Sequence, residues 1–126
     1  MIRWGVLFTL FLAMAGMAAD PASKGTVLRH VVSIKFKPGA TPAQIKTVEE
    51  AFRDLKNKIP EIASLEWGVN NSEEGHDKGF THCFILTFKS EADRAVYLPH
   101  PSHKAFGTVL RPVMEDVMVV DFWSRE

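Results

Sequence analysis

The sequence predicts an α+β domain in which helices cover one face of a four-stranded antiparallel sheet. Four short segments have the alternating or continuous apolar pattern of strands, and three others have the three- and four-residue apolar spacing of helices. Their order along the chain is strand, helix, strand, strand, helix, helix, strand. One layer of helices on one sheet is the simplest architecture that buries the apolar side of every element.

The chain begins with the features of a signal peptide over residues 1–19. Arg3 comes early, an uncharged apolar run follows, and small residues close the segment at Ala19. The run is shorter than the roughly 20 residues of a membrane-spanning helix, although a retained anchor is the alternative. We therefore expect an exported chain, periplasmic or secreted, with no membrane segment after cleavage. Residues 20–27 are expected to be a linker and residues 28–126 a single domain.

The charge balance argues against binding to nucleic acid or anionic lipid, and the cysteine count excludes an internal disulfide. Cleavage would remove one basic residue and leave the mature chain with one more acidic than basic residue. Such a chain has no excess of basic side chains to attract nucleic acid or anionic lipid. Cys83 is the one cysteine in the sequence, so no internal disulfide can form, and its apolar neighbours predict a buried thiol. The fold must therefore rest on its apolar core.

The strands are predicted at residues 28–37, 64–70, 81–89 and 116–123. The first and third each have one apolar face that also carries a histidine. In the first strand this face holds His30, Val32, Ile34 and Phe36, and in the third it holds His82, Phe84, Leu86 and Phe88. The second strand alternates Leu65, Trp67 and Val69.

The first helix has a complete start signal. Thr41 is the expected N-cap, Pro42 the first helical residue and Gln44 the capping-box partner, and Pro60 ends the helix. Its apolar face is expected to hold Ile45, Val48, Phe52, Leu55 and Ile59.

Two shorter helices follow the third strand. Ser90 is expected to cap a helix that Pro99 interrupts, and another helix follows Pro101 until Pro112 bends or ends it. The expected apolar side of the latter is Phe106, Val109, Leu110 and Val113. The whole order fits the ferredoxin-like arrangement of a four-stranded antiparallel sheet with helices on one face.

The second face of this sheet is too apolar to remain in water. Cys83, Ile85 and alternate members of 117–120 are expected to lie on it, which would leave a large exposed apolar patch. Packing two such sheets face to face removes the patch, so we expect a homodimer.

Several stretches together resemble the stress-response A/B barrel domain (Dabb) family over residues 28–122. They are LRHVVSIKFKPGATPAQI, GVNNSEEGHDKGFTH, YLPHPSHKAF and DVMVVDF. The resemblance implies a dimeric α+β barrel of ferredoxin-like subunits. A plant polyketide cyclase of this family closes a ring by aldol condensation without a cofactor, using a tyrosine and the second histidine of a His-Pro-x-His motif. Those positions correspond here to Tyr97 and His103.

The resemblance also implies that His30 and His82 line the same pocket, and Phe84 and Trp67 complete the expected ligand-binding set. No cofactor and no metal are expected, although some family members carry magnesium on helix-end carbonyls. The ligand would be a small apolar or aromatic molecule.

The residues alone support acid–base chemistry but leave a structural alternative open. His103 lies three residues before Phe106, which places it on the inward side of its helix, so three imidazoles and the Tyr97 hydroxyl could share one apolar cavity. Histidine can act as a general base and a phenol can donate to an enolate oxygen. The alternative is that these histidines only satisfy backbone carbonyls.

A metal site is a further alternative, since His100 and His103 have a spacing that can share a ligand. However, Pro99 and Pro101 break the helix there and restrict His100 to a turn. Three functions therefore remain open: a ligand-binding dimer, a cofactor-free cyclase or lyase with His103 as base and Tyr97 as donor, and a purely structural dimer.

Overall fold

The computed structural model describes residues 25–125, so the predicted signal peptide and most of the linker lie outside the described residues. The elements follow the predicted order, with one additional 3₁₀ turn. They are β1 (Leu28–Phe36), α2 (Pro42–Lys58), β2 (Ser64–Val69), β3 (His82–Phe88), α3 (Glu91–Tyr97), α4 (Pro101–Leu110), η1 (Arg111–Val113) and β4 (Met114–Trp123).

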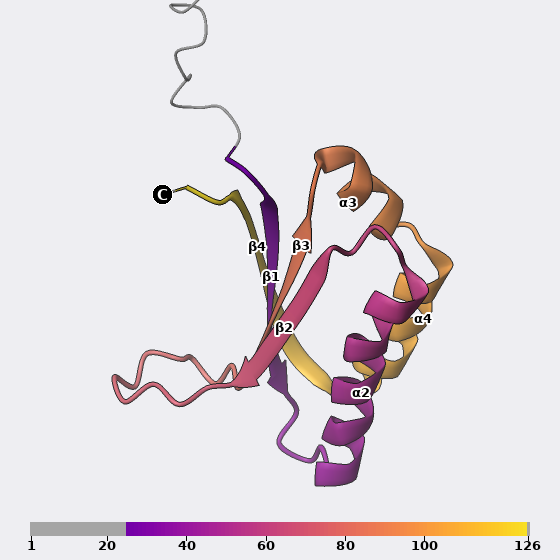
Figure 1. Cartoon of the computed structure of the whole chain (residues 1–126). Helices are drawn as coiled ribbons and strands as arrows, with labels where there is room; N and C mark the ends of the chain where they lie inside the picture. Colours follow the sequence, from indigo (N-terminus) through magenta and orange to yellow (C-terminus); the bar gives the residue numbers. More distant parts are fainter. Residues whose placement is uncertain (1–24, 126) are drawn as a thin grey trace, which may run out of the picture.

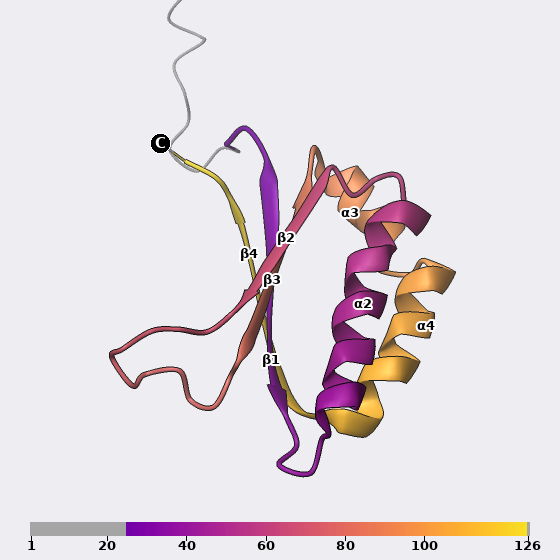
Figure 2. The same cartoon turned by 60° about the horizontal axis from the view of Figure 1, so that its bottom comes forward.

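The four strands form one antiparallel sheet in the order β2-β3-β1-β4. Helices α2 and α4 lie along one face, α3 lies near one end of the same side, and the opposite face has no helix on it (Figures 1 and 2). The predicted ferredoxin-like α+β architecture is confirmed. No helix within residues 25–125 is long and apolar enough to cross a membrane.

The helix starts are those that the sequence predicts. The Thr41 side chain accepts from the Gln44 backbone N–H at 3.2 Å, and the Gln44 side chain accepts from the Thr41 N–H at 2.9 Å. The Ser90 hydroxyl accepts from the Asp93 N–H at 3.0 Å. Because these caps satisfy backbone groups that a helix leaves unpaired, they fix where α2 and α3 begin.

Aromatic stacking joins the helical layer to the sheet. Phe52 of α2 stacks on Phe84 of β3 with ring centroids 4.1 Å apart, and it contacts Phe106 of α4 at 4.5 Å. Burying aromatic side chains contributes a large share of core energy, and stacked pairs add to it. The alternating core face of β1 continues this layer with Leu28, His30, Val32 and Ile34.

Val109, which is expected on the apolar side of its helix, and Val69 at the end of β2 are both exposed. Val109 is 37% exposed, whereas Val113 is 8% exposed, because α4 ends at Leu110 and the following 3₁₀ turn directs Val113 inward. Val69 is 57% exposed at the end of β2, where the long loop to β3 begins. Periodicity predicts an apolar helix side that includes Val109, and it places Val69 on the same strand face as Leu65 and Trp67.

The face of the sheet that has no helices is apolar at its centre. The strand register brings Val31 beside Ile85 on one side and beside Val120 on the other. Met118, Val120 and Phe122 of β4 are each about half exposed. Cys83 also points to this face and is half-buried in the single subunit, so the expectation of a buried thiol is not met there. We call this surface the open face.

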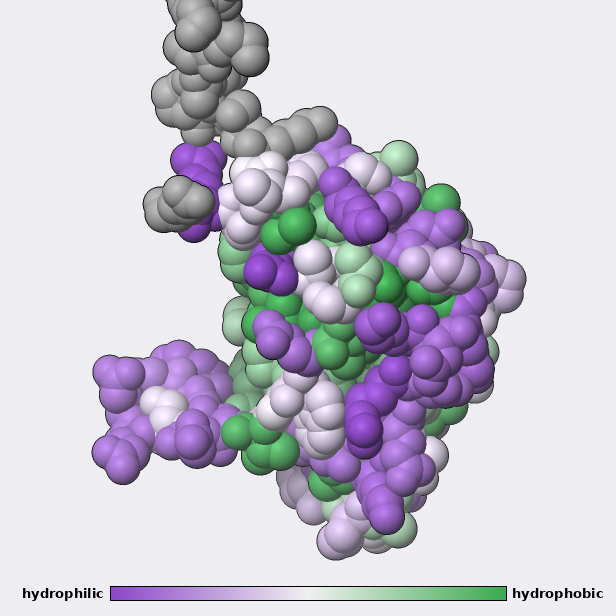
Figure 3. Space-filling view, in the orientation of Figure 1, coloured by the Kyte–Doolittle hydropathy of each residue, from purple (hydrophilic) through white to green (hydrophobic). Residues whose placement is uncertain are grey.

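The loop between β2 and β3, residues 70–81, projects away from the helices on the side of the open face (Figures 1 and 2). Its outer part is hydrophilic (Figure 3). Asn70 donates to Asp77 at 2.9 Å, and Asp77 accepts from the Gly79 N–H at 3.1 Å. Gly79 has a φ of 87°, a conformation that favours glycine. These contacts give the polar loop a defined shape.

The difference between Val109 and Val113 can be measured directly. We expect Val113→Ala to lower the free energy of unfolding by about 2 kcal/mol, since two buried carbons are lost at ~0.8 kcal/mol each with a cavity left behind. Val109→Ala should change it by less than about 0.5 kcal/mol. Urea unfolding followed by circular dichroism measures both. Equal losses in the two variants would contradict the described end of α4.

Candidate functional site

The stretch YLPHPSHKAF forms a tight corner between α3 and α4. Tyr97 is the last residue of α3, and the chain turns through Leu98 and Pro99. His100 is the N-cap of α4, where its Nδ1 accepts from the Ser102 backbone N–H at 3.0 Å, and Pro101 is the first helical residue. The sequence predicts a turn at His100, and the structure adds that its ring caps the helix. This cap fixes the direction of α4 and therefore the place of His103.

His103 is held by a backbone carbonyl. Its Nδ1 lies 2.8 Å from the Leu98 carbonyl oxygen. A carbonyl can only accept, so Nδ1 carries the hydrogen and Nε2 of the neutral ring has a free lone pair. The ring lies against Tyr97 with centroids 4.3 Å apart at an angle of 31°. Nδ1 of His103 therefore satisfies a backbone carbonyl, as the structural alternative expects. Nε2 remains available to a ligand.

Tyr97 is almost completely buried, with 1% of its surface exposed. Its ring packs against Phe88 at 5.3 Å and His30 at 5.7 Å. Burial raises the pKa of the Tyr97 hydroxyl well above its usual range, because the phenolate would lose its hydration. The group therefore stays protonated and acts as a donor.

The Tyr97 hydroxyl makes no hydrogen bond within residues 25–125. In that part of the chain, every completely buried side-chain nitrogen or oxygen has a hydrogen-bond partner. Because the Tyr97 hydroxyl has no such partner, it must be accessible to solvent, although the ring that carries it is buried. An unpaired donor at a small opening is available to a ligand oxygen.

His30 of β1 lies on the other side of Tyr97. It is buried, and its Nδ1 lies 2.8 Å from Oδ1 of Asp121 on β4. The second carboxylate oxygen, Oδ2, accepts from Nη1 of Arg94 on α3 at 2.8 Å. Since α3, β1 and β4 each contribute one residue, these contacts connect three elements around the tyrosine.

The structure places His82 away from Tyr97, His30 and His103. In the sheet His30 pairs with Leu86, while His82 pairs with Ile34. Four residues of strand separate the two positions, or about 13 Å at ~3.3 Å per residue. His82 Nε2 lies 2.8 Å from Glu49 Oε2, and its Nδ1 lies 2.9 Å from the Thr81 hydroxyl. Two histidines, not three, therefore meet at Tyr97.

Trp67 and Phe84 pack with His82 rather than with Tyr97. The Trp67 ring stacks on Phe84 at 5.4 Å and lies 6.1 Å from His82. The Arg53 guanidinium lies 5.8 Å above the Trp67 ring, within the range of a cation–π contact. The predicted ligand-binding set thus divides into His30 beside Tyr97 and a separate aromatic group around His82.

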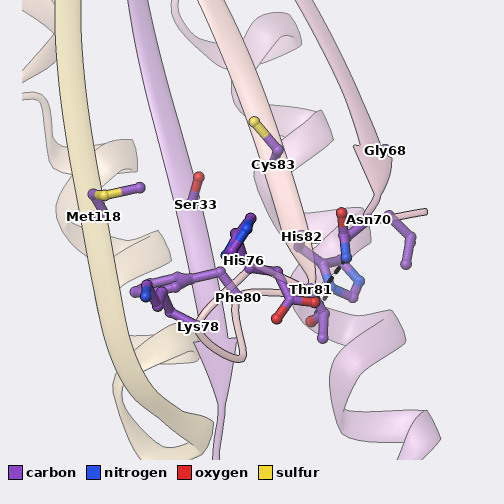
Figure 4. A pocket seen from close by; sticks show the side chains of 12 residues that line it. Ser33, Gly68, Asn70, His76, Lys78, Phe80, Thr81, His82, Cys83 and Met118 are labelled. Carbon is purple, nitrogen blue, oxygen red and sulfur yellow. Dashed lines mark hydrogen bonds between the residues drawn. The ribbon is translucent and has the colours of Figure 1, made fainter. Parts of the chain in front are cut away.

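Two surface hollows of the described chain lie away from Tyr97. One of about 430 Å³ lies between the open face and the loop 70–81, with Met118, Cys83, Phe80 and His82 in its lining (Figure 4). Another of about 460 Å³ lies beside Trp67 and Arg53. Neither hollow includes Tyr97 or His103 in its lining.

Sequence reasoning did not find Asp121, Arg94 or Glu49. Their roles come from strand register and helix placement: Asp121 is the β4 partner of His30, and Glu49 of α2 reaches His82 across the layers. An aspartate inside the last apolar strand was the one available signal for Asp121. Among residues 25–125, no group of three or more histidine, cysteine or acidic side chains is arranged to hold a metal ion.

Comparison with known proteins identifies relatives over nearly the whole domain. A family model described as Stress responsive A/B Barrel Domain matches residues 28–124. The stress-response A/B barrel domain-containing protein HS1 of Arabidopsis thaliana is 34% identical over 100 residues, covering 79% of this chain and 91% of that protein. Olivetolic acid cyclase of Cannabis sativa is 30% identical over 99 residues, covering 79% and 98%.

Solved structures agree with the fold. Hydroxynitrile lyase from Passiflora edulis has a TM-score of 0.74 at 27% identity, covering 79% of this chain and 94% of that one. A protein from Thermobifida fusca, described as a dimeric ferredoxin-like protein of unknown function, has a TM-score of 0.68 at 23% identity, covering 79% and 92%. At that identity the second likeness shows the fold alone.

The raised pKa of Tyr97 can be measured without ambiguity, because the sequence has one tyrosine. We expect no phenolate absorbance in the folded protein at about pH 10, the usual midpoint for tyrosine, whereas the urea-unfolded chain should titrate there. Since the folded pKa lies above the unfolded one, the stabilising contribution is full below about pH 10 and declines as the pH rises further. A folded protein that ionises near pH 10 would contradict the burial of the Tyr97 side chain.

Proposed function

The chain belongs to the stress-responsive A/B barrel domain family, and we propose that its Tyr97–His103 corner binds a small, partly apolar molecule that carries an oxygen acceptor. One observation carries this proposal: the Tyr97 hydroxyl and His103 Nε2 lie on rings 4.3 Å apart, and neither atom has a protein partner within residues 25–125. A donor and an acceptor carried on two packed rings can hold a polar group of a ligand while the aromatic rings contact the apolar remainder.

The packing of the core bears on how a ligand could enter. Phe52 contacts both Phe84 and Phe106 between sheet and helices, and we therefore place the entry at the α3–α4 corner. Leu98 at that corner is half exposed. The proposal therefore requires the corner to shift outward when a ligand binds, as lids and loops do at many binding sites.

A homodimer is the second part of the proposal. Val31, Ile85, Met118, Val120 and Phe122 give the open face an apolar centre. Water contact with such a patch is unfavourable, and a second sheet packed face to face would remove it. Ferredoxin-like neighbours described as dimeric support this assembly.

Export is the third part, and it rests on residues 1–19 alone. The early Arg3, the apolar run and the small residues before Asp20 support removal of the leader and release into the periplasm or the medium. A mature chain that begins at or near Asp20 is the direct sign of this processing.

A second candidate function is cofactor-free catalysis at the same corner. Two relatives, olivetolic acid cyclase and hydroxynitrile lyase, are named as enzymes. His103 Nε2 would take a proton from carbon next to a carbonyl, and the Tyr97 O–H would donate to the developing enolate oxygen. The Tyr97 hydroxyl keeps its proton at neutral pH, and its raised pKa favours donation of a hydrogen bond over complete transfer of the proton.

Native mass spectrometry of the protein purified from its own host tests ligand binding. We expect a co-purifying small molecule on the wild type that is lost in Tyr97→Phe and in His103→Ala, because each removes one of the two polar contacts. His76→Ala, in the exposed loop, is the control and should retain the molecule. The mass of the chain also reports the leader. A molecule that persists in both corner variants would contradict this site.

Light scattering of the mature chain tests the dimer. We expect a dimeric wild type and a monomeric Val120→Asp variant, because the substitution would bury an unpaired carboxylate between the two sheets. Val96→Asp is the matched control: Val96 is 43% exposed on α3 and Val120 is 51% exposed on the open face. The control should remain dimeric. A monomeric wild type, or a dimer unaffected by Val120→Asp, would refute the face-to-face assembly.

A further inference from the structure

Behind Tyr97 lies a set of contacts that the proposed function does not use. Arg94 Nη1 donates to Asp121 Oδ2 at 2.8 Å, and Asp121 Oδ1 lies 2.8 Å from His30 Nδ1. The arginine and aspartate side chains are each about one-quarter exposed, whereas that of His30 is 6% exposed. The histidine ring lies edge-on to Tyr97 at 5.7 Å. An ion pair at the rim thus holds an imidazole that is buried beside the tyrosine.

The carboxylate determines which nitrogen of His30 carries the hydrogen. An ionised carboxylate only accepts hydrogen bonds, so Nδ1 must donate. Nε2 of the neutral ring then has a free lone pair, and no partner for it lies within residues 25–125. Because that part of the chain has no completely buried polar side-chain atom without a partner, Nε2 also reaches solvent-accessible space.

We propose that Arg94 and Asp121 are positioning residues that hold His30 in the Nδ1–H tautomer, so that its Nε2 is a second acceptor, on a ring that packs against Tyr97. The ligand in this inference is the one that the proposed function assumes. The positioning of His30 depends only on the contacts described above. Arg94 is essential to it because the carboxylate could otherwise rotate away from the ring. The guanidinium occupies Oδ2 and leaves Oδ1 for the imidazole.

The arrangement defines a class of ligand. Tyr97 offers one donor, while His103 and His30 offer one acceptor each, so the site favours a molecule that has both an acceptor oxygen and a donor O–H. Phenols, enols and hydroxy-carbonyl compounds have both, whereas plain hydrocarbons have neither. Phe88, which packs on Tyr97 and His30, is completely buried and supports the two rings from within the core.

The tautomer of His30 can be observed in the full mature chain. Long-range ¹H–¹⁵N NMR at neutral pH distinguishes a protonated from an unprotonated ring nitrogen, and His30→Gln assigns the signals. We expect only the Nδ1–H form of His30 in the wild type and a mixture with the Nε2–H form in Arg94→Met. Arg53→Met is the matched control, because Arg53 lies over Trp67, and it should leave His30 unchanged. An Nε2–H tautomer in the wild type, or no change in Arg94→Met, overturns the inference.

The ligand class is tested in the same samples with two probes of similar size. Phenol should shift the His30 Nε2 signal in the wild type. In Arg94→Met the same phenol concentration should give a shift at least fivefold smaller. Toluene should not shift the signal in either protein. Equal effects of phenol and toluene, or no effect of phenol, would contradict the ligand class.

Failure of this inference and failure of the proposed function give different results. If the protein carries a host molecule but the His30 tautomer is the same in the wild type and in Arg94→Met, the positioning role alone is refuted. A protein that binds neither phenol nor a host molecule, but has the expected tautomers, supports the positioning role and counts against ligand binding.

Discussion

The candidate site depends on one hydrogen bond, from His103 Nδ1–H to the Leu98 carbonyl. This bond closes the corner between α3 and α4, and it brings the imidazole against the Tyr97 ring. It also sets the tautomer, because the carbonyl can only accept. The cap made by His100 on α4 and the two prolines around it direct the backbone so that this bond can form. The corner is thus both a helix connection and the part of the fold that exposes a free imidazole nitrogen.

The sheet supplies the second constraint, because antiparallel register fixes which side chains share a position along the strands. His30 lies at the end of β1 that faces α3, between β3 and β4, so Asp121 can reach its ring while Arg94 approaches from the helix. The same register places His82 near the opposite end, where Glu49 and Thr81 satisfy both of its nitrogens. One histidine therefore has a free nitrogen beside the tyrosine, and the other has none.

The sequence predicted the fold well because each element carries its own signals. Periodicity identified the strands, and Thr41, Gln44 and Ser90 marked the helix starts that the structure has. The site was predicted in part. Tyr97 and His103 are close in sequence, so local geometry brings them together, whereas periodicity assigns His30 and His82 to a face but not to a position along the sheet. Asp121 and Arg94 depend on contacts between distant segments, which no local pattern encodes.

The proposed function depends on two atoms at the corner that have no protein partner within residues 25–125, Tyr97 Oη and His103 Nε2. A crystal structure of the host-purified protein, at a resolution that shows ordered water, tests them most directly. We expect a ligand or water oxygen within hydrogen-bond distance of both atoms, in an opening of the α3–α4 corner. If both atoms are instead bonded to protein groups, of the same subunit or of a second copy, the corner is a structural element and not a binding site.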